Sequence, residues 1–100
     1  MSETSGSFVF HGVGQGLCYS GQIFEEGMAD VNFIYDCGTL YKKDRIFLDT
    51  AINKIFDIFK KKVTFLFLSH LDKDHIYGVP QLLKEFDVEY VFCPIFPQKS

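Results

Sequence analysis

The sequence predicts a domain of the α/β class. Its sheet is expected to be mixed (α+β), with the elements in the order βββαβαβ. Three observations support this prediction. Three short segments rich in alternating apolar residues come first, separated by glycines and charged turns. A segment with helical spacing then leads into a continuous apolar run, which is typical of a strand inside an α/β sheet. A short helical pattern and a last β-rich segment follow. With 100 residues, 47% of them hydrophobic, the chain is one small domain or part of one.

The ends of the chain are expected to lie outside the folded part. The segment Met1–Gly6 is small and polar, and it reads as a disordered tail. The domain is therefore expected over residues 7–97, with a second tail at 98–100.

The first three strands are expected over residues 7–13, 17–24 and 31–35. Between the first two, Gly12–Gly16 holds three glycines in five residues. A hairpin turn is favoured over a phosphate-binding loop, because no helix N-terminus and no P-loop lysine follow. The third strand is expected to end at Asp36, a carboxylate that would face whatever lies over that edge of the sheet.

Between Asp44 and Lys62 the apolar period becomes helical, with one face formed by Leu48, Ile52, Ile55, Phe56 and Phe59. Lys60–Lys62 could contact nucleic acid, but positive charge that complements a helix C-terminus is the favoured interpretation. The run Val63–Leu68 predicts a strand buried on both faces.

A second helix is predicted from four apolar residues at helical spacing, Val79, Leu82, Leu83 and Phe86. Pro80 fits its first turn. The segment Val88–Cys93 then predicts the last strand, which Pro94 ends.

The three cysteines, Cys18, Cys37 and Cys93, lie far apart in apolar surroundings and are expected to be buried free thiols. No apolar run approaches the roughly 20 residues that span a bilayer. Without a signal peptide, the chain is expected to be soluble and cytoplasmic, with no membrane partner. A net charge of −3 gives no reason to expect non-specific attraction to nucleic acid.

Four metal-competent side chains follow the buried strand within six residues: His70, Asp72, Asp74 and His75. Imidazole and carboxylate groups suit a divalent transition metal, and α/β proteins bind ligands beyond the carboxyl ends of their strands. The alternative is a polar turn in which the histidines are merely hydrogen-bonded. Four potential ligands in so short a stretch favour a metal site.

The stretch Ser-His-Leu-Asp-Lys-Asp-His-Ile-Tyr-Gly over residues 69–78 resembles the His-x-His-x-Asp-His signature of the metallo-β-lactamase-fold hydrolases. Asp72 stands where the second histidine is usual, as in the branch similar to competence DNA-uptake proteins. Val13–Gly16 and Ile34–Gly38 resemble two further motifs of that branch, in the right order.

The resemblance implies half of a four-layer αββα sandwich and two divalent metal ions. It implies that His70 and Asp72 bind the first ion, and that Asp74, which also takes part in catalysis, binds the second with His75. The resemblance also implies that Asp36 binds no metal ion itself and instead orients the loop that carries the ligands. Zinc is expected, and the extra carboxylate makes manganese or magnesium credible.

The implied function is hydrolysis of a phosphodiester, with single-stranded DNA or another nucleic acid as substrate. The second half of such a domain normally supplies further ligands, but no histidine follows His75, and His11 would be a speculative substitute. The chain is therefore expected to be an N-terminal half with an exposed apolar sheet face, inactive alone. A C-terminal half, a partner chain or a homodimer would complete it. The alternative is a non-catalytic metal-binding or interaction module.

Overall fold

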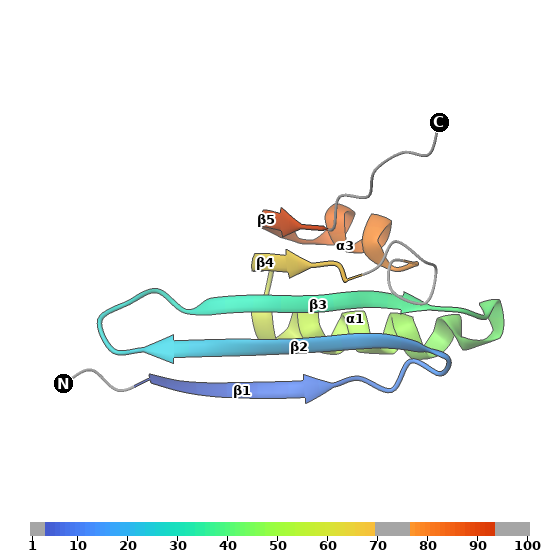
Figure 1. Ribbon diagram of the computed structural model, residues 1–100, viewed down its shortest axis with the longest axis horizontal. Coiled ribbons are helices and arrows are strands. Elements are labelled where there is room, and N and C mark those ends of the chain that lie inside the picture. The colour runs from blue at the N-terminus through green and yellow to red at the C-terminus, as the bar shows by residue number, and fades with distance from the viewer. Residues whose placement is uncertain (1–3, 70–76, 94–100) are drawn as a thin grey trace.

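In the computed structural model, which describes residues 4–69 and 77–93, the chain forms a five-stranded sheet with helices packed against it (Figure 1). The elements, in chain order, are β1 (Thr4–Phe10), β2 (Gly16–Glu25), β3 (Val31–Thr39), the 3₁₀-helix η1 (Lys42–Asp44), α1 (Arg45–Phe59), β4 (Lys62–Phe67), α3 (Val79–Glu85) and β5 (Asp87–Phe92). The predicted mixed sheet and the order βββαβαβ are confirmed.

The strands follow one another across the sheet in the order β1-β2-β3-β4-β5. The first three pair antiparallel, whereas β3, β4 and β5 pair parallel to one another. The carboxyl ends of β1, β3, β4 and β5 therefore lie at one edge of the sheet, together with the start of β2. The segments that follow these strands therefore start at that edge.

The first strand differs from the expectation in its limits. It begins at Thr4, inside the segment that was expected to be a disordered tail, and ends at Phe10. The reason is the length of β2, whose ten residues offer partners to Ser5 and Gly6. The N-terminal residues therefore extend the ladder, and His11 already belongs to the turn.

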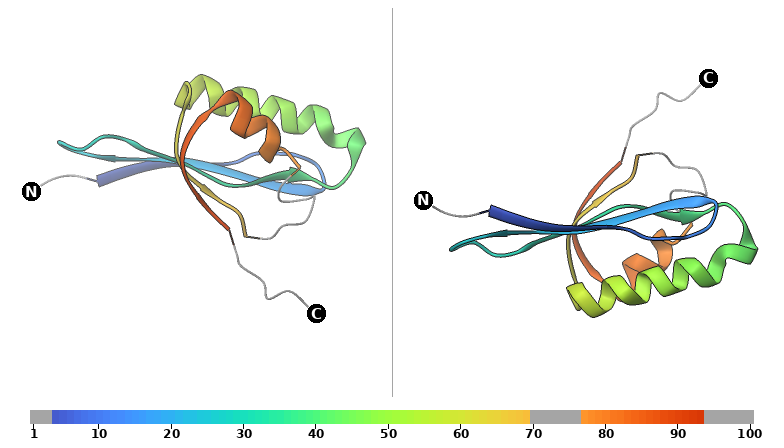
Figure 2. Two further views of the ribbon diagram at one scale, coloured as in Figure 1. Left: turned by 90° about the horizontal axis from the view of Figure 1, so that it is seen from above. Right: turned by 90° about the horizontal axis from the view of Figure 1, so that it is seen from below.

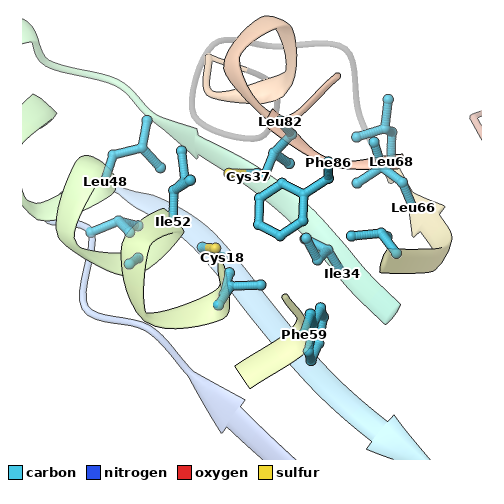
Figure 3. Close-up of a cluster of buried hydrophobic side chains, with 14 residues drawn as sticks. Cys18, Ile34, Cys37, Leu48, Ile52, Phe59, Leu66, Leu68, Leu82 and Phe86 are labelled. Carbon is cyan, nitrogen blue, oxygen red and sulfur yellow. The ribbon is translucent and has the colours of Figure 1, made fainter. Parts of the chain in front are cut away.

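Both helices lie on the same face of the sheet (Figure 2). The core lies between them and the strands, where side chains such as Leu48, Ile52 and Leu82 are fully buried against Ile34 (Figure 3). The helical spacing predicted for α1 is thus confirmed. Leu83 was expected on the buried face of α3 but is 52% exposed, because Leu82 and the residue after the helix, Phe86, already fill the space below α3.

The opposite face of the sheet carries exposed and half-buried rings, and no element of the described chain covers it. This aromatic face is formed by nine residues: Phe8, Phe10, Tyr19, Phe33, Tyr35, Phe65, Phe67, Tyr90 and Phe92. The prediction that β4 is buried on both faces is therefore wrong, because both helices pack on one side. The expected exposed apolar face is confirmed.

Cys18 and Cys37 are buried free thiols, as predicted, and they face each other across β2 and β3. A hydrogen bond with Cys18, and after it burial, raises the pKa of Cys37 well above its usual value. Cys93 is a free thiol too, but it is exposed, since it follows an edge strand that no further element covers among the described residues.

The longest helix in the described part of the chain has 15 residues, and none there is long and apolar enough to cross a membrane.

Candidate functional site

The candidate site begins at a β-bulge in β3. Tyr19 pairs with Tyr35 and Cys18 pairs with Cys37, so Asp36 is an extra residue that no residue of β2 opposes. Its backbone has a φ of 59°, in the left-handed region that few non-glycine residues adopt. Bulges of this kind redirect a side chain and are frequent beside active sites.

The bulge corrects the prediction that the third strand ends at Asp36, because β3 continues to Thr39. The parallel pairing of β3 with β4, however, ends at Tyr35 and Phe67. Asp36 therefore lies at the point where β4 leaves the sheet, which is the edge that the sequence predicted for it.

The carboxylate of Asp36 is fully buried and accepts two hydrogen bonds from Ser69, the second residue after β4. The backbone N–H of Ser69 donates to Oδ1 at 2.7 Å, and its hydroxyl donates to Oδ2 at 2.5 Å. Hydrogen bonds to an ionised acceptor are stronger than neutral ones and are strengthened further by burial. The position of the chain immediately before His70 is thus fixed by Asp36.

The neighbouring residue of the bulge holds the chain after the predicted ligands. The backbone N–H of Gly78 donates to the carbonyl oxygen of Cys37 at 2.8 Å. A Cβ atom at position 78 would lie 2.8 Å from Sγ of Cys37, so the close approach requires glycine. Two consecutive residues of β3 therefore hold the chain on both sides of the ligand segment, which we define as His70–His75.

The four predicted ligands, His70, Asp72, Asp74 and His75, lie outside the residues that the structure describes. Within the described residues, no group of three or more histidine, cysteine, aspartate or glutamate side chains could hold a metal ion. The ligand assignment therefore stays a prediction from the sequence, to which the structure adds the anchoring of the chain on either side.

A cavity of about 370 Å³ opens at the carboxyl ends of β4 and β5, between Tyr35 of β3 and Ser69. Its walls are formed mainly by apolar side chains, namely Tyr35, Phe67, Leu68, Phe92 and Cys93. Ligand sites are commonly apolar hollows with a few polar groups at their edge. The cavity lies beside Ser69, from which the chain continues into the ligand segment.

The glycine loop, which we define as His11–Gln15, is a hairpin turn as predicted. Gly14 has a φ of 72°, and the hydroxyl of Thr39 donates to the carbonyl oxygen of Val13 at 2.8 Å. The backbone N–H of Gln15 donates to Oδ2 of the buried Asp44 at 3.2 Å. A buried carboxylate against the loop opposes phosphate binding there, which supports the turn.

His11 does not join the residues around Asp36. Its Nε2 lies 2.7 Å from the hydroxyl of Ser20, and its ring lines a groove of about 650 Å³ against α1 that includes neither Asp36 nor Ser69. Burial, and after it the positive charge of Lys54, lowers the pKa of His11. The structure therefore gives no support to His11 as a further metal ligand.

Sequence reasoning missed two residues of this site, Ser69 and Gly78, although it quoted both within the motif. The signal for the bulge was also present. Tyr35 faces the aromatic side, so strict alternation would place Cys37 there too, whereas a small buried thiol suits the core. A break in alternation at Asp36 is what an inserted residue produces.

A mixed sheet with both helices on one face, and a site at the ends of its parallel strands, defines an α/β protein whose other sheet face is free to pack against a further layer. The family model described as the metallo-beta-lactamase superfamily matches residues 12–94. The chain belongs to that superfamily.

Two curated relatives are ribonucleases J from mycoplasmas. The chain is 37% identical over 71 residues to the protein from Mycoplasma genitalium (strain G37), and 37% identical over 68 residues to that from Mycoplasma pneumoniae (strain M129). Each match covers 65% of this chain, which spans only 12% of the length of either relative.

One solved structure has a similar fold, that of a peroxy diiron species of the chemotaxis sensor ODP. The TM-score is 0.53 at 20% sequence identity, over 89% of this chain and 36% of the other. At this identity the likeness supports the partial metallo-beta-lactamase fold and nothing further.

Proposed function

We propose that this chain is the metal-binding N-terminal half of a hydrolase domain that cleaves phosphodiester bonds in nucleic acid. The observation that carries the proposal is the anchoring of the ligand segment by the bulge, through Asp36 at Ser69 and through Cys37 at Gly78. A segment with four potential metal ligands, held on both sides by a buried strand, is what a preorganised metal site requires.

The donor set fits two divalent cations, zinc or the harder manganese and magnesium. We assign His70 and Asp72 to the first cation and Asp74 and His75 to the second, and give Asp74 a part in catalysis. Such a pair, when bound, supplies an activated water and polarises the phosphodiester.

The remaining residues of the site position the chain and shape access to it. Asp36 holds Ser69, and we assign it the role of orienting the ligands that follow. The hydrogen bond from the backbone N–H of Gly78 to the carbonyl oxygen of Cys37 holds the chain against β3. We assign the cavity beside Ser69, whose walls include Tyr35 and Phe67, to substrate access.

The substrate that we favour is RNA, because both curated relatives are named ribonuclease J. Single-stranded DNA is the competing substrate, since Asp72 gives the motif its likeness to the competence DNA-uptake branch. We place the protein in the cytoplasm, where the free thiols of Cys18 and Cys37 suit the reducing conditions. A C-terminal half or a partner chain supplies the remaining ligands.

Metal titration of the purified chain tests the first part of the proposal. Calorimetry with Zn²⁺ and Mn²⁺ is expected to show binding by the wild type, and a loss of affinity of about tenfold or more in Asp74→Ala and His75→Ala. Exchange of the exposed Asp49, which lies on α1, for alanine is the control and leaves binding unchanged. Equal binding by all four proteins would refute the metal site.

Cleavage of matched fluorescent RNA and DNA strands tests the second part, with a natural polypeptide that contains this chain and a second half-domain. Faster cleavage of RNA supports the favoured substrate, and faster cleavage of DNA supports the competence branch. Turnover that survives the combined Asp74→Ala and His75→Ala exchange would rule out the proposed mechanism.

A non-catalytic interaction module is the second candidate, and the observation that favours it is the uncovered aromatic face. For this candidate, the purified chain binds no metal but recognises another protein surface. The metal titration separates the two candidates, because only the hydrolase half requires affinity that depends on Asp74 and His75.

A further inference from the structure

Arg45, the first residue of α1, joins that helix to the chain that follows the ligand segment. Its guanidinium carbon lies over the ring of Tyr77, 5.1 Å from the ring centroid. A terminal N–H of the same guanidinium donates to Oε1 of Gln81, in the first turn of α3, at 3.1 Å. We define Arg45, Tyr77 and Gln81 as the Arg45 cluster.

The chain at Tyr77 is attached to two different layers of the fold. The ring of Tyr77 is half-buried and packs against the hydrophobic core. The next residue, Gly78, donates its backbone N–H to the carbonyl oxygen of Cys37 in β3. The sheet therefore holds the backbone at position 78, and Arg45 of α1 holds the side chain at position 77. A single hydrogen bond leaves the chain free to rotate about it, whereas two attachments on consecutive residues also fix its direction.

Arg45 has a third contact, an ion pair with Asp49 one turn further along α1, in which Nε and Oδ1 lie 3.1 Å apart. The two side chains are 42% and 44% exposed, and exposed pairs of this kind contribute little to stability. The ion pair uses Nε, so removal of Asp49 leaves the contacts with Tyr77 and Gln81 in place. A planar guanidinium can stack on a ring and donate from its edge at once, which the point charge of a lysine cannot do.

Metal ligands must be held in direction as well as in position, and the groups behind them change metal affinity for this reason. The ligand segment leads into the Arg45 cluster, since His75 precedes Tyr77 by two residues. On its other side the segment is preceded by Ser69, which the buried Asp36 holds. Each side of the ligand segment thus has its own side-chain attachment.

We propose that Arg45 is a positioning residue of the metal site and acts through Tyr77. By fixing the direction in which the chain leaves the ligand segment, it supports the binding of the second cation by Asp74 and His75. The first cation depends instead on the attachment at Asp36. The inference rests on the proposed function, and it adds to the site a residue of α1.

Calorimetric titration of the purified chain with Mn²⁺ tests the proposal. Arg45→Gln and Tyr77→Leu each remove the contact between the cation and the ring, and metal affinity is expected to fall about fivefold in either variant. The combined variant is expected to lose no more than either alone, because both exchanges remove the same contact. Arg45→Lys keeps a cation near the ring and is expected to recover part of the affinity.

The sign of the effect separates positioning from charge. Loss of a positive charge near the ligands reduces repulsion, so a purely electrostatic effect of Arg45→Gln would raise the affinity for a divalent cation. The matched control is Lys43→Gln, which removes the same charge from over another ring, that of Tyr41, at 5.3 Å from its centroid. Tyr41 lies between β3 and η1, away from the Arg45 cluster in the sequence, and this variant should bind Mn²⁺ as the wild type does.

Hydrogen exchange in the metal-free chain, followed by NMR, gives a second readout at the backbone N–H groups of Gly78 and Ser69. In Arg45→Gln, exchange at Gly78 is expected to accelerate by a similar factor, because its hydrogen bond to Cys37 opens more often. Exchange at Ser69, which Asp36 holds, should stay that of the wild type. Equal acceleration at both groups would reduce Arg45 to a residue that stabilises the fold and would overturn the proposal.

The metal titration also distinguishes failure of this inference from failure of the proposed function. Equal affinity in Arg45→Gln and wild type, when His75→Ala has lost binding, would overturn the role of Arg45 and leave the proposed function intact. Equal affinity in His75→Ala and wild type would overturn the metal site and this inference with it. Arg45→Gln carries the test alone if Tyr77→Leu fails to fold.

Discussion

Two connections leave the sheet at the same edge, and a buried aspartate holds each of them where it begins or ends. Asp44 accepts a hydrogen bond from the backbone N–H of Gln15 in the glycine loop at 3.2 Å. Asp36 accepts one from the backbone N–H of Ser69 at 2.7 Å and a second from its hydroxyl. The two carboxylates are 8% and 0% exposed.

The loops differ in what they contain. Between His11 and Gln15 the glycine loop carries only Gly12, Val13 and Gly14, and its contacts close a hairpin. The chain that Asp36 holds leads directly into the four potential metal ligands of the ligand segment. A buried carboxylate that accepts a backbone N–H is therefore a structural device for holding a loop, and the side chains of that loop determine whether it serves chemistry.

The largest effect is expected from Asp36→Ala, which breaks the stronger of the two attachments. The exchange leaves the N–H and hydroxyl of the partly buried Ser69 without these acceptors, so the free energy of unfolding should fall by about 3 kcal/mol. Urea denaturation measures it. Asp49→Ala, which removes an exposed carboxylate, is the control, and a loss no greater than that of the control would contradict the attachment.

The next largest effect is expected from Gly78→Ala, which strains the second attachment, the contact between Gly78 and Cys37. The new Cβ would lie 2.8 Å from Sγ of Cys37 and 3.2 Å from Leu48, at a cost of about 1–3 kcal/mol for overpacking. Gly12→Ala is the matched control, because nothing lies within 4 Å of a Cβ there. Thermal unfolding of both variants compares them, and equal midpoints would show that the contact does not constrain the chain.

Asp44→Ala is expected to cost less, about 1–2 kcal/mol, because it leaves only the N–H of Gln15 without this acceptor. Denaturation in urea gives the value. This variant sharpens the comparison, since it loosens a loop at the same edge without touching the ligand segment. A cost above that of Asp36→Ala would reverse the order of the two attachments.

The smallest effect on stability is expected from protonation of His11, which lies at the start of the glycine loop. Its pKa in the folded chain is lowered from 6.5, so acid protonates the unfolded chain first. Stability should therefore fall as the pH drops below 6.5, and level off below the folded pKa. Denaturation at several pH values should show this slope in the wild type and a flatter one in His11→Gln. An unchanged slope would assign it to other groups.

The sequence predicted the order of the elements because each carries a local signal, such as the helical spacing of Leu48 and Ile52 or the turn residue Pro80. It also placed Asp36 at the edge of the sheet from which the ligand segment continues. The bulge was missed because the insertion of one residue depends on pairing with Cys18 and Tyr19, which lie far away in the chain.

The aromatic face could be predicted in part from the sequence. Aromatic residues occur two positions apart in four strands, as in Phe33 and Tyr35 or Phe65 and Phe67, and this spacing puts them on one side of a sheet. The apolar run of β4 hid this pattern, because strands buried on both faces are equally apolar. Which side the helices cover is decided by tertiary packing, which no single segment encodes.

The most direct test of the central claim, that the Asp36 bulge prepares the ligand segment for metal, is the Mn²⁺ and Zn²⁺ affinity of two variants. Calorimetric titration should show a loss of about 10–100-fold for Asp36→Ala under conditions where it stays folded. Asp44→Ala should bind as the wild type does. Equal affinity in folded Asp36→Ala and wild type, or an equal loss in both variants, would contradict the claim.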